Sequence, residues 1–80
     1  MSLEVKIVGF DKSSERLVFE KPVPVGAVAY VKTIADVPAT DPDLLGSYPL
    51  TAGQVSKVAA AAQITIDPTE FSYFLEADEA

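Results

Sequence analysis

The sequence contains no cysteine and no histidine. Without cysteine, the chain has no disulfide, no thiolate nucleophile and no cysteine-bound zinc or iron–sulfur cluster. Without histidine, it lacks the side chain that most often titrates near neutral pH and most often binds transition metals. Nucleophile systems that need either residue are excluded. We therefore expect no catalytic residues, no metal and no cofactor, and a protein that is not an enzyme.

Long apolar runs and nucleotide-binding fingerprints are also missing. No stretch approaches the roughly 20 apolar residues of a membrane helix. The first residues lack the basic and apolar regions of a signal peptide, and the four glycines are too scattered for a phosphate-binding loop. Together with the lack of disulfides, this pattern predicts a cytoplasmic protein without a membrane segment.

Positive charge is scarce in the second half of the chain. The net charge is −6 over 80 residues. Residues 1–40 carry five acids and five bases, whereas residues 41–80 carry seven acids and the single base Lys57. Such a surface repels nucleic acid and anionic membranes and speeds association with a basic protein. The alternative is that the negative charge only maintains solubility.

The length and apolar content indicate one folded domain over residues 1–80. Hydrophobic residues make up 49% of the chain, which is too many for a disordered sequence. A domain of this size buries only about 60% of its unfolded surface, so its core is modest. There is little material for a deep substrate cleft.

The first forty residues predict a hairpin and then a helix. Apolar residues alternate with charged ones over residues 3–10, and residues 15–20 form a second apolar run after a polar turn. Two prolines follow, and residues 25–35 then show a helical stripe. Because this segment is rich in β-branched residues, a strand over residues 28–34 is the alternative.

The connector over residues 36–49 contains three prolines, which break any long element. Asp41 and Asp43 are predicted to cap a short turn that holds Leu44 and Leu45. These two acids are too few, and the expected glutamate is missing, for a calcium loop of the EF-hand type.

A capping box at Thr51 and Gln54 predicts a helix to about Gln63. Residues 64–66 look like a short strand. Residues 70–77 alternate at period 2, which favours a strand, and a terminal helix is the alternative. Residues 78–80 are expected to form a frayed tail. The fold class is therefore α+β: a small antiparallel sheet, made of the hairpin and the C-terminal strand, packed against two helices.

Tyrosines next to carboxylates make a good protein-binding surface, since tyrosine provides contact area at low entropic cost. On this basis, we predict a partner-binding patch in the second half of the chain. Its candidate residues are Asp41, Asp43, Tyr48, Tyr73, Glu76, Asp78 and Glu79. The alternative is that the aromatic residues belong to the core.

Several short motifs resemble a family of small uncharacterised bacterial domains, some of which are similar to immunity proteins that neutralise toxins of competing bacteria. The motifs are Asp11-Lys12 at the hairpin turn, Asp41-Pro42, Ser47-Tyr48-Pro49-Leu50 and the ending Phe71-Ser72-Tyr73-Phe74-Leu75-Glu76. The resemblance implies a cytoplasmic protein that acts by binding another protein. It gives no catalytic residues.

The expected function is thus a protein-binding module, as in an immunity-type inhibitor of a basic toxin. No binding to nucleic acid or membranes is expected. The alternative is a homo-oligomeric structural subunit, because an exposed sheet face or edge in so apolar a chain is readily buried by self-association.

Overall fold

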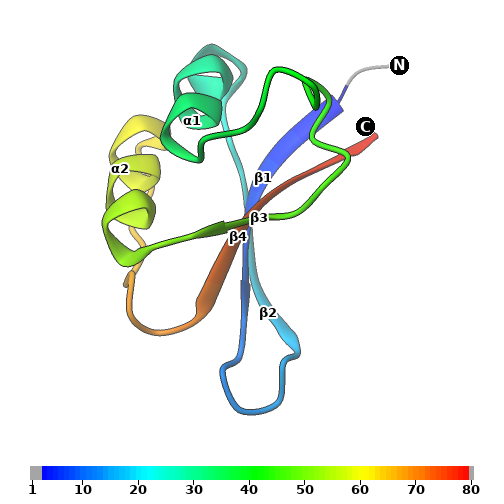
Figure 1. Ribbon diagram of the computed structural model, residues 1–80. Coiled ribbons are helices and arrows are strands. Elements are labelled where there is room, and N and C mark those ends of the chain that lie inside the picture. Colours follow the sequence, from blue (N-terminus) through cyan, green and yellow to red (C-terminus); the bar gives the residue numbers. More distant parts are fainter. Residues whose placement is uncertain (1–2, 80) are drawn as a thin grey trace.

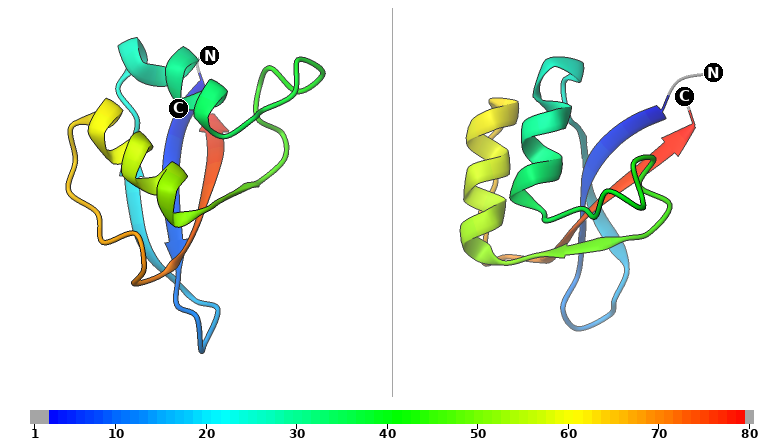
Figure 2. Two further views of the ribbon diagram at one scale, coloured as in Figure 1. Left: turned by 60° about the vertical axis from the view of Figure 1, so that its left-hand side comes forward. Right: turned by 45° about the horizontal axis from the view of Figure 1, so that its top comes forward.

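A computed structural model describes the backbone of residues 3–79 and the side chains of residues 4–78. A four-stranded antiparallel sheet, in the order β2-β1-β4-β3, has two helices on one face (Figures 1 and 2). The elements are β1 (Leu3–Phe10), β2 (Leu17–Pro22), the 3₁₀ turn η1 (Val25–Ala27), α1 (Val28–Ile34), β3 (Tyr48–Leu50), α2 (Ala52–Ala62) and β4 (Ser72–Glu79). The predicted α+β class is confirmed.

The two inner strands are the first and the last elements of the chain. β1 and β4 pair along their whole length, from Leu3 opposite Glu79 to Phe10 opposite Ser72. β2 pairs with the other edge of β1, and the short β3 pairs with β4. The two central strands of the sheet therefore come from opposite ends of the sequence (Figure 1).

Period-2 alternation assigns the strand side chains to two faces. Val5 and Ile7 of β1, with Tyr73 and Leu75 of β4, pack under the helices in one buried cluster. That cluster also contains Val23, Val31, Ala35, Leu44, Val55 and Val58. The intervening residues of β1 and β4 lie on the opposite face, which the helices do not cover (Figure 2).

Both predicted helices are present, which settles residues 25–35 as helical. The capping box at α2 is formed as expected: the Gln54 backbone N–H donates to Thr51 Oγ1 at 3.2 Å, and the Thr51 N–H donates to Gln54 Oε1 at 2.8 Å. The Gln54 side-chain amide also donates to the carbonyl oxygen of Ile34 at 2.9 Å. One glutamine thus begins α2 and ties it to the end of α1.

Two segments differ from the prediction. The connector contains β3, a strand of three residues that includes Pro49; proline is tolerated there because β3 is an edge strand with one side unpaired. Residues 64–66 are not a strand, and their backbone lies outside the sheet. Ile64 and Ile66 instead pack half-buried against the core.

The ends of two strands also differ. β2 begins at Leu17 and not at residue 15, since Glu15 has a φ of 58° and lies in the turn. The expected frayed tail is wrong for Asp78 and Glu79, whose backbone continues β4 because β1 pairs with it. Ala80 lies outside the described residues. Residues 70–77 are thereby settled as mainly strand. Among the described residues, no helix has both the length and the apolar character needed to cross a membrane.

Candidate functional site

The face of the sheet opposite the helices carries most of the charged side chains of the strands. We call it the open face and define it by the side chains that alternate away from the core. These are Glu4, Lys6, Val8 and Phe10 of β1, Glu20 of β2, and Phe74, Glu76 and Asp78 of β4. Four carboxylates therefore surround one lysine on this face.

Lys6 lies at the centre of the open face and is 8% exposed. Its ammonium group donates to Glu20 Oε2 at 3.1 Å and also to the carboxylate of Asp78. The hydrogen bond to Asp78, and then that to Glu20, raise the pKa of Lys6 above its ordinary value. Its positive charge is therefore matched within the molecule. Because four carboxylates surround this one lysine, the open face has a net negative charge.

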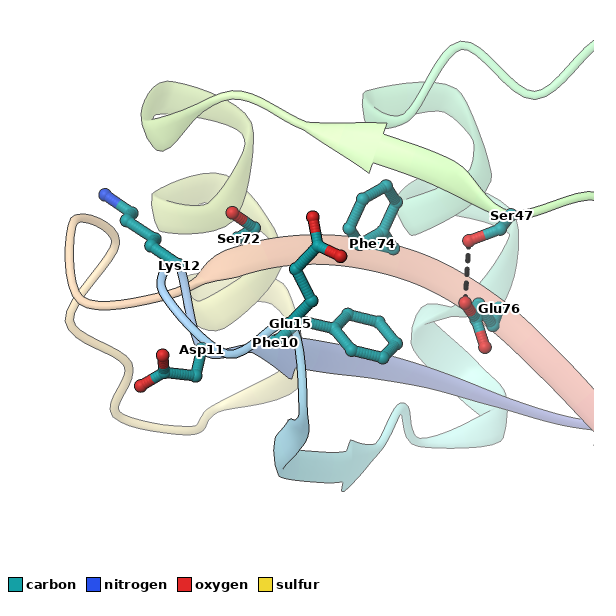
Figure 3. A pocket seen from close by; sticks show the side chains of 8 residues that line it. All are labelled: Phe10, Asp11, Lys12, Glu15, Ser47, Ser72, Phe74 and Glu76. Carbon is teal, nitrogen blue, oxygen red and sulfur yellow. Dashed lines mark hydrogen bonds between the residues drawn. The ribbon is translucent and has the colours of Figure 1, made fainter.

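Beside this ion cluster lies an open hollow of about 400 Å³ (Figure 3). Phe10 and Phe74 meet edge to face at its base, with ring centroids 5.6 Å apart. Glu15 and Glu76 line its sides, and Glu76 accepts a hydrogen bond from the hydroxyl of Ser47 at 2.6 Å. Asp11 also lines the hollow, but its carboxylate accepts the backbone N–H groups of Ser13 and Ser14. The hollow thus combines aromatic surface with the carboxylates of Glu15 and Glu76.

Lys12 also lines the hollow, but its charge is directed elsewhere. Its ammonium group donates to the carbonyl oxygen of Thr69 at 2.8 Å, in the loop that precedes β4. In Figure 3 its side chain extends away from the two phenylalanines. An aromatic floor with carboxylate walls is the environment that a lysine or arginine side chain from another molecule would prefer.

Asp41 and Tyr48, two of the residues predicted for the patch, are joined to each other. The Asp41 carboxylate accepts the N–H groups of Leu45 at 2.8 Å and Gly46 at 3.0 Å, and the hydroxyl of Tyr48 also donates to it. The bond from Tyr48, followed by the two backbone bonds, holds the pKa of Asp41 below its usual range. The same contact raises the pKa of Tyr48. These residues fix the connector in place.

Only part of the predicted patch lies on the open face. Glu76 and Asp78 lie there, whereas Asp43 is exposed on the connector. The prediction of Tyr73 as a surface residue of the patch is corrected by its burial. Tyr73 is 4% exposed and its hydroxyl donates to the carbonyl oxygen of Asp67 at 2.6 Å, so it belongs to the core. Its alternation with Leu75 places it under the helices. The side chain of Glu79 lies outside the described part.

Four residues that complete the open face and its hollow were not predicted from the sequence: Lys6, Phe10, Glu15 and Glu20. The signal for the β1 residues was available, because alternation already separates Lys6 and Phe10 from Val5 and Ile7. The proximity of Glu15 and Glu20 to the side chains of β1 and β4 could not be predicted, because it depends on the strand order. Among the side chains that the structure describes, no group of three or more acids lies close enough to hold a metal ion.

Comparison with protein families gives one result. A family model described as a domain of unknown function (DUF7683) matches residues 4–76, which is nearly the whole chain. Comparisons with curated proteins and with solved structures give no match. This match supports the predicted resemblance to a family of small uncharacterised domains, and it does not support the predicted likeness to immunity proteins.

Proposed function

The chain belongs to the DUF7683 family of domains of unknown function, and on that premise we propose that it is a non-enzymatic module that binds a basic partner protein through the open face. The observation that carries the proposal is the hollow formed by Phe10 and Phe74, with Glu15 and Glu76 on its sides. A cationic side chain of the partner would lie over the rings and pair with these carboxylates.

The charges around the hollow support this assignment. Lys6 is paired with Glu20 and Asp78, so it offers no free positive charge to an acidic partner. Glu4, Glu15 and Glu76 remain to meet basic groups. Complementary charge of this kind mainly raises the association rate and fixes orientation.

The finer form of the proposal is an immunity-type inhibitor. A basic toxin that cleaves nucleic acid binds phosphates, and the carboxylates of the open face would occupy those positions. A cytoplasmic location agrees with the absence of cysteine. The second candidate function, a homo-oligomeric subunit, is favoured by a different surface, which carries the exposed residues Val25 and Leu45.

The test compares two triple variants with the same charge change. Glu4→Gln, Glu15→Gln and Glu76→Gln remove three negative charges from the open face and its hollow and leave the Lys6 pairs intact. Asp36→Asn, Asp67→Asn and Glu70→Gln remove three exposed charges elsewhere. A partner captured on the immobilised domain is purified and titrated calorimetrically against each variant.

We expect the open-face variant to bind at least about tenfold more weakly and the control variant to bind nearly as the parent does. Binding should also weaken strongly between about 0.01 M and about 1 M salt, as the Debye length falls from about 30 Å to about 3 Å. Equal affinities of both variants, or binding that does not respond to salt, would contradict the proposal.

A further inference from the structure

A second open hollow, of about 410 Å³, adjoins the hollow of the open face. Ser72 and Phe74 line both hollows, so the two form one groove across the start of β4 (Figure 3). Beyond these two residues, the second hollow is lined mainly by apolar side chains from β3, α2 and the loop before β4: Pro49, Leu50, Ala52, Pro68 and Phe71. One end of the groove is therefore acidic and the other end is apolar.

Lys12 gives the two ends of the groove different preferences. It lines both hollows, and its ammonium group donates to the carbonyl oxygen of Thr69, which itself lines the second hollow. Among the described residues that line the second hollow, Lys12 alone is charged. A basic side chain that entered this hollow would be repelled by the ammonium group and would find no carboxylate. The second hollow therefore favours an apolar side chain.

The backbone beside the groove limits how a partner can bind. β3 has three residues, and Pro49 at its centre has no N–H group. A partner segment would gain little by pairing with this edge as a further strand, so its side chains must make the contacts. In an extended segment, side chains two positions apart lie on one side, roughly 7 Å from each other. That arrangement suits two hollows that share Ser72 and Phe74.

We propose that the groove binds an extended segment of a partner protein in which a lysine or arginine and a bulky apolar residue are two positions apart. The cationic side chain occupies the hollow of the open face, and this half of the inference rests on the proposed function. The apolar side chain occupies the second hollow. The groove thereby distinguishes such a segment from a run of basic residues, which would place a cation beside Lys12.

The test titrates synthetic peptides into the full chain labelled with ¹⁵N and follows the backbone amide signals by NMR. The mixed peptide is acetyl-Gly-Arg-Ser-Leu-Gly-amide, made also with arginine and leucine exchanged, and the all-basic peptide has arginine at both positions. One order of the mixed peptide should bind at least about tenfold more tightly than the all-basic peptide, although the latter carries more positive charge. The reason is that burial of a leucine side chain is favourable, whereas a second cation is repelled.

Three variants test the second hollow. Ala52→Gln places a longer polar side chain in it and should weaken binding of the mixed peptide at least about fivefold, with little change for the all-basic peptide. Ala60→Gln makes the same change at an exposed position of α2 that lines neither hollow, and should change nothing. Lys12→Gln should strengthen binding of the all-basic peptide and reduce the difference between the two peptides. The amide spectrum of each variant also shows whether it is folded.

The outcomes separate this inference from the proposed function. Equal affinities of the mixed and all-basic peptides, an Ala52→Gln variant that binds the mixed peptide as the parent does, or no binding of any peptide at about 1 mM would each overturn the inference. The combined change Glu15→Gln and Glu76→Gln should weaken both peptides. If it does so while the two peptides bind equally, the proposed function stands and the role of the second hollow is disproved.

Discussion

At the residue scale, the carboxylate of Asp41 organises the connector. It accepts two backbone N–H groups and the hydroxyl of Tyr48, and these bonds lower its pKa. A group whose pKa is lower in the folded chain than in the unfolded chain stabilises the fold at pH values above its pKa in the unfolded chain. That contribution is lost as the pH falls through the pKa of the group in the folded chain.

Replacing Asp41 with asparagine should therefore lower the urea midpoint at pH 7 and flatten the loss of stability on acidification. The asparagine amide cannot accept all three hydrogen bonds. Asp36→Asn makes the same charge change at an exposed residue with a φ of 57°, which asparagine tolerates, and is the control. The measurement is urea denaturation from pH 7 downwards. An Asp41→Asn curve parallel to that of the parent at every pH would show that the carboxylate has no such role.

Gly9 is a second residue with a specific packing role. A Cβ atom at this position would lie 3.0 Å from Cε1 of Tyr73 and 3.1 Å from Cβ of Phe19. The rings of Phe19 and Tyr73 meet edge to face beside it, at a centroid distance of 5.8 Å. The glycine makes room for this aromatic pair.

We expect Gly9→Ala to destabilise the fold by about 1–3 kcal/mol, as overpacking of a filled core does. Gly26→Ala is the control, because nothing lies within 4 Å of its Cβ position. That change should be neutral or slightly stabilising. Chemical denaturation of both variants measures the difference, and equal stabilities would contradict the packing argument.

At the scale of elements, the sequence predicts best the segments whose signals are local. The capping box, the hairpin alternation and the alternation in β4 each lie within a few residues, and the structure confirms all three. β3 was missed because three residues with a proline show no period. Residues 64–66 were wrongly assigned, since two isoleucines at period 2 satisfy the strand pattern whether or not a neighbouring strand is available.

The junction of the two helices gives the prediction at this scale. Thr51→Ala removes one side-chain cap of α2 and should cost about 1 kcal/mol. Gln54→Ala removes the reciprocal bond to the Thr51 N–H and also the bond to Ile34, so it should cost roughly 1 kcal/mol more. An isolated helix depends mainly on its N-cap residue, so the opposite order of the two costs would mean that the Ile34 contact contributes nothing. Urea denaturation of both variants gives the comparison.

At the scale of the whole molecule, the strand order determines where charge collects. Composition predicts an acidic second half, but Glu4, Glu15 and Glu20 of the first half join Glu76 and Asp78 on one side of the sheet. This assembly cannot be predicted from composition, because it requires β1 to lie between β2 and β4. Glu76 and Asp78 could therefore be predicted from the sequence as acidic candidates. The face on which they meet Glu4, Glu15 and Glu20 could not be predicted.

Lys6 is the cation that balances this collection of acids. Because the pKa of Lys6 is raised in the folded chain, its contribution to stability is complete at pH values below the ordinary lysine pKa. That contribution is lost only as the pH rises through the higher pKa of the folded chain. Lys6→Met should therefore cost about 1–3 kcal/mol at pH 7, because Glu20 and Asp78 lose their partner.

The same variant should gain more stability from added salt than the parent does, since ions screen the repulsion that Lys6 otherwise offsets. Lys57→Met makes the same charge change at an exposed position on α2 and should behave as the parent. Denaturation in urea at low and high salt provides the data. A salt response equal for Lys6→Met and Lys57→Met would disprove this role of Lys6.

The pairing of β1 with β4 also governs the time at which the fold can form. Lys6 and Asp78 are 72 positions apart, yet their strands make the centre of the sheet. During synthesis, β1 and β2 emerge early but have no inner neighbour until residues 72–79 leave the ribosome. An isolated two-stranded hairpin is marginal in water. Since contacts between distant segments also slow folding, native structure should appear only once residues 72–79 are available and then almost at once, without a stable intermediate built from residues 1–40.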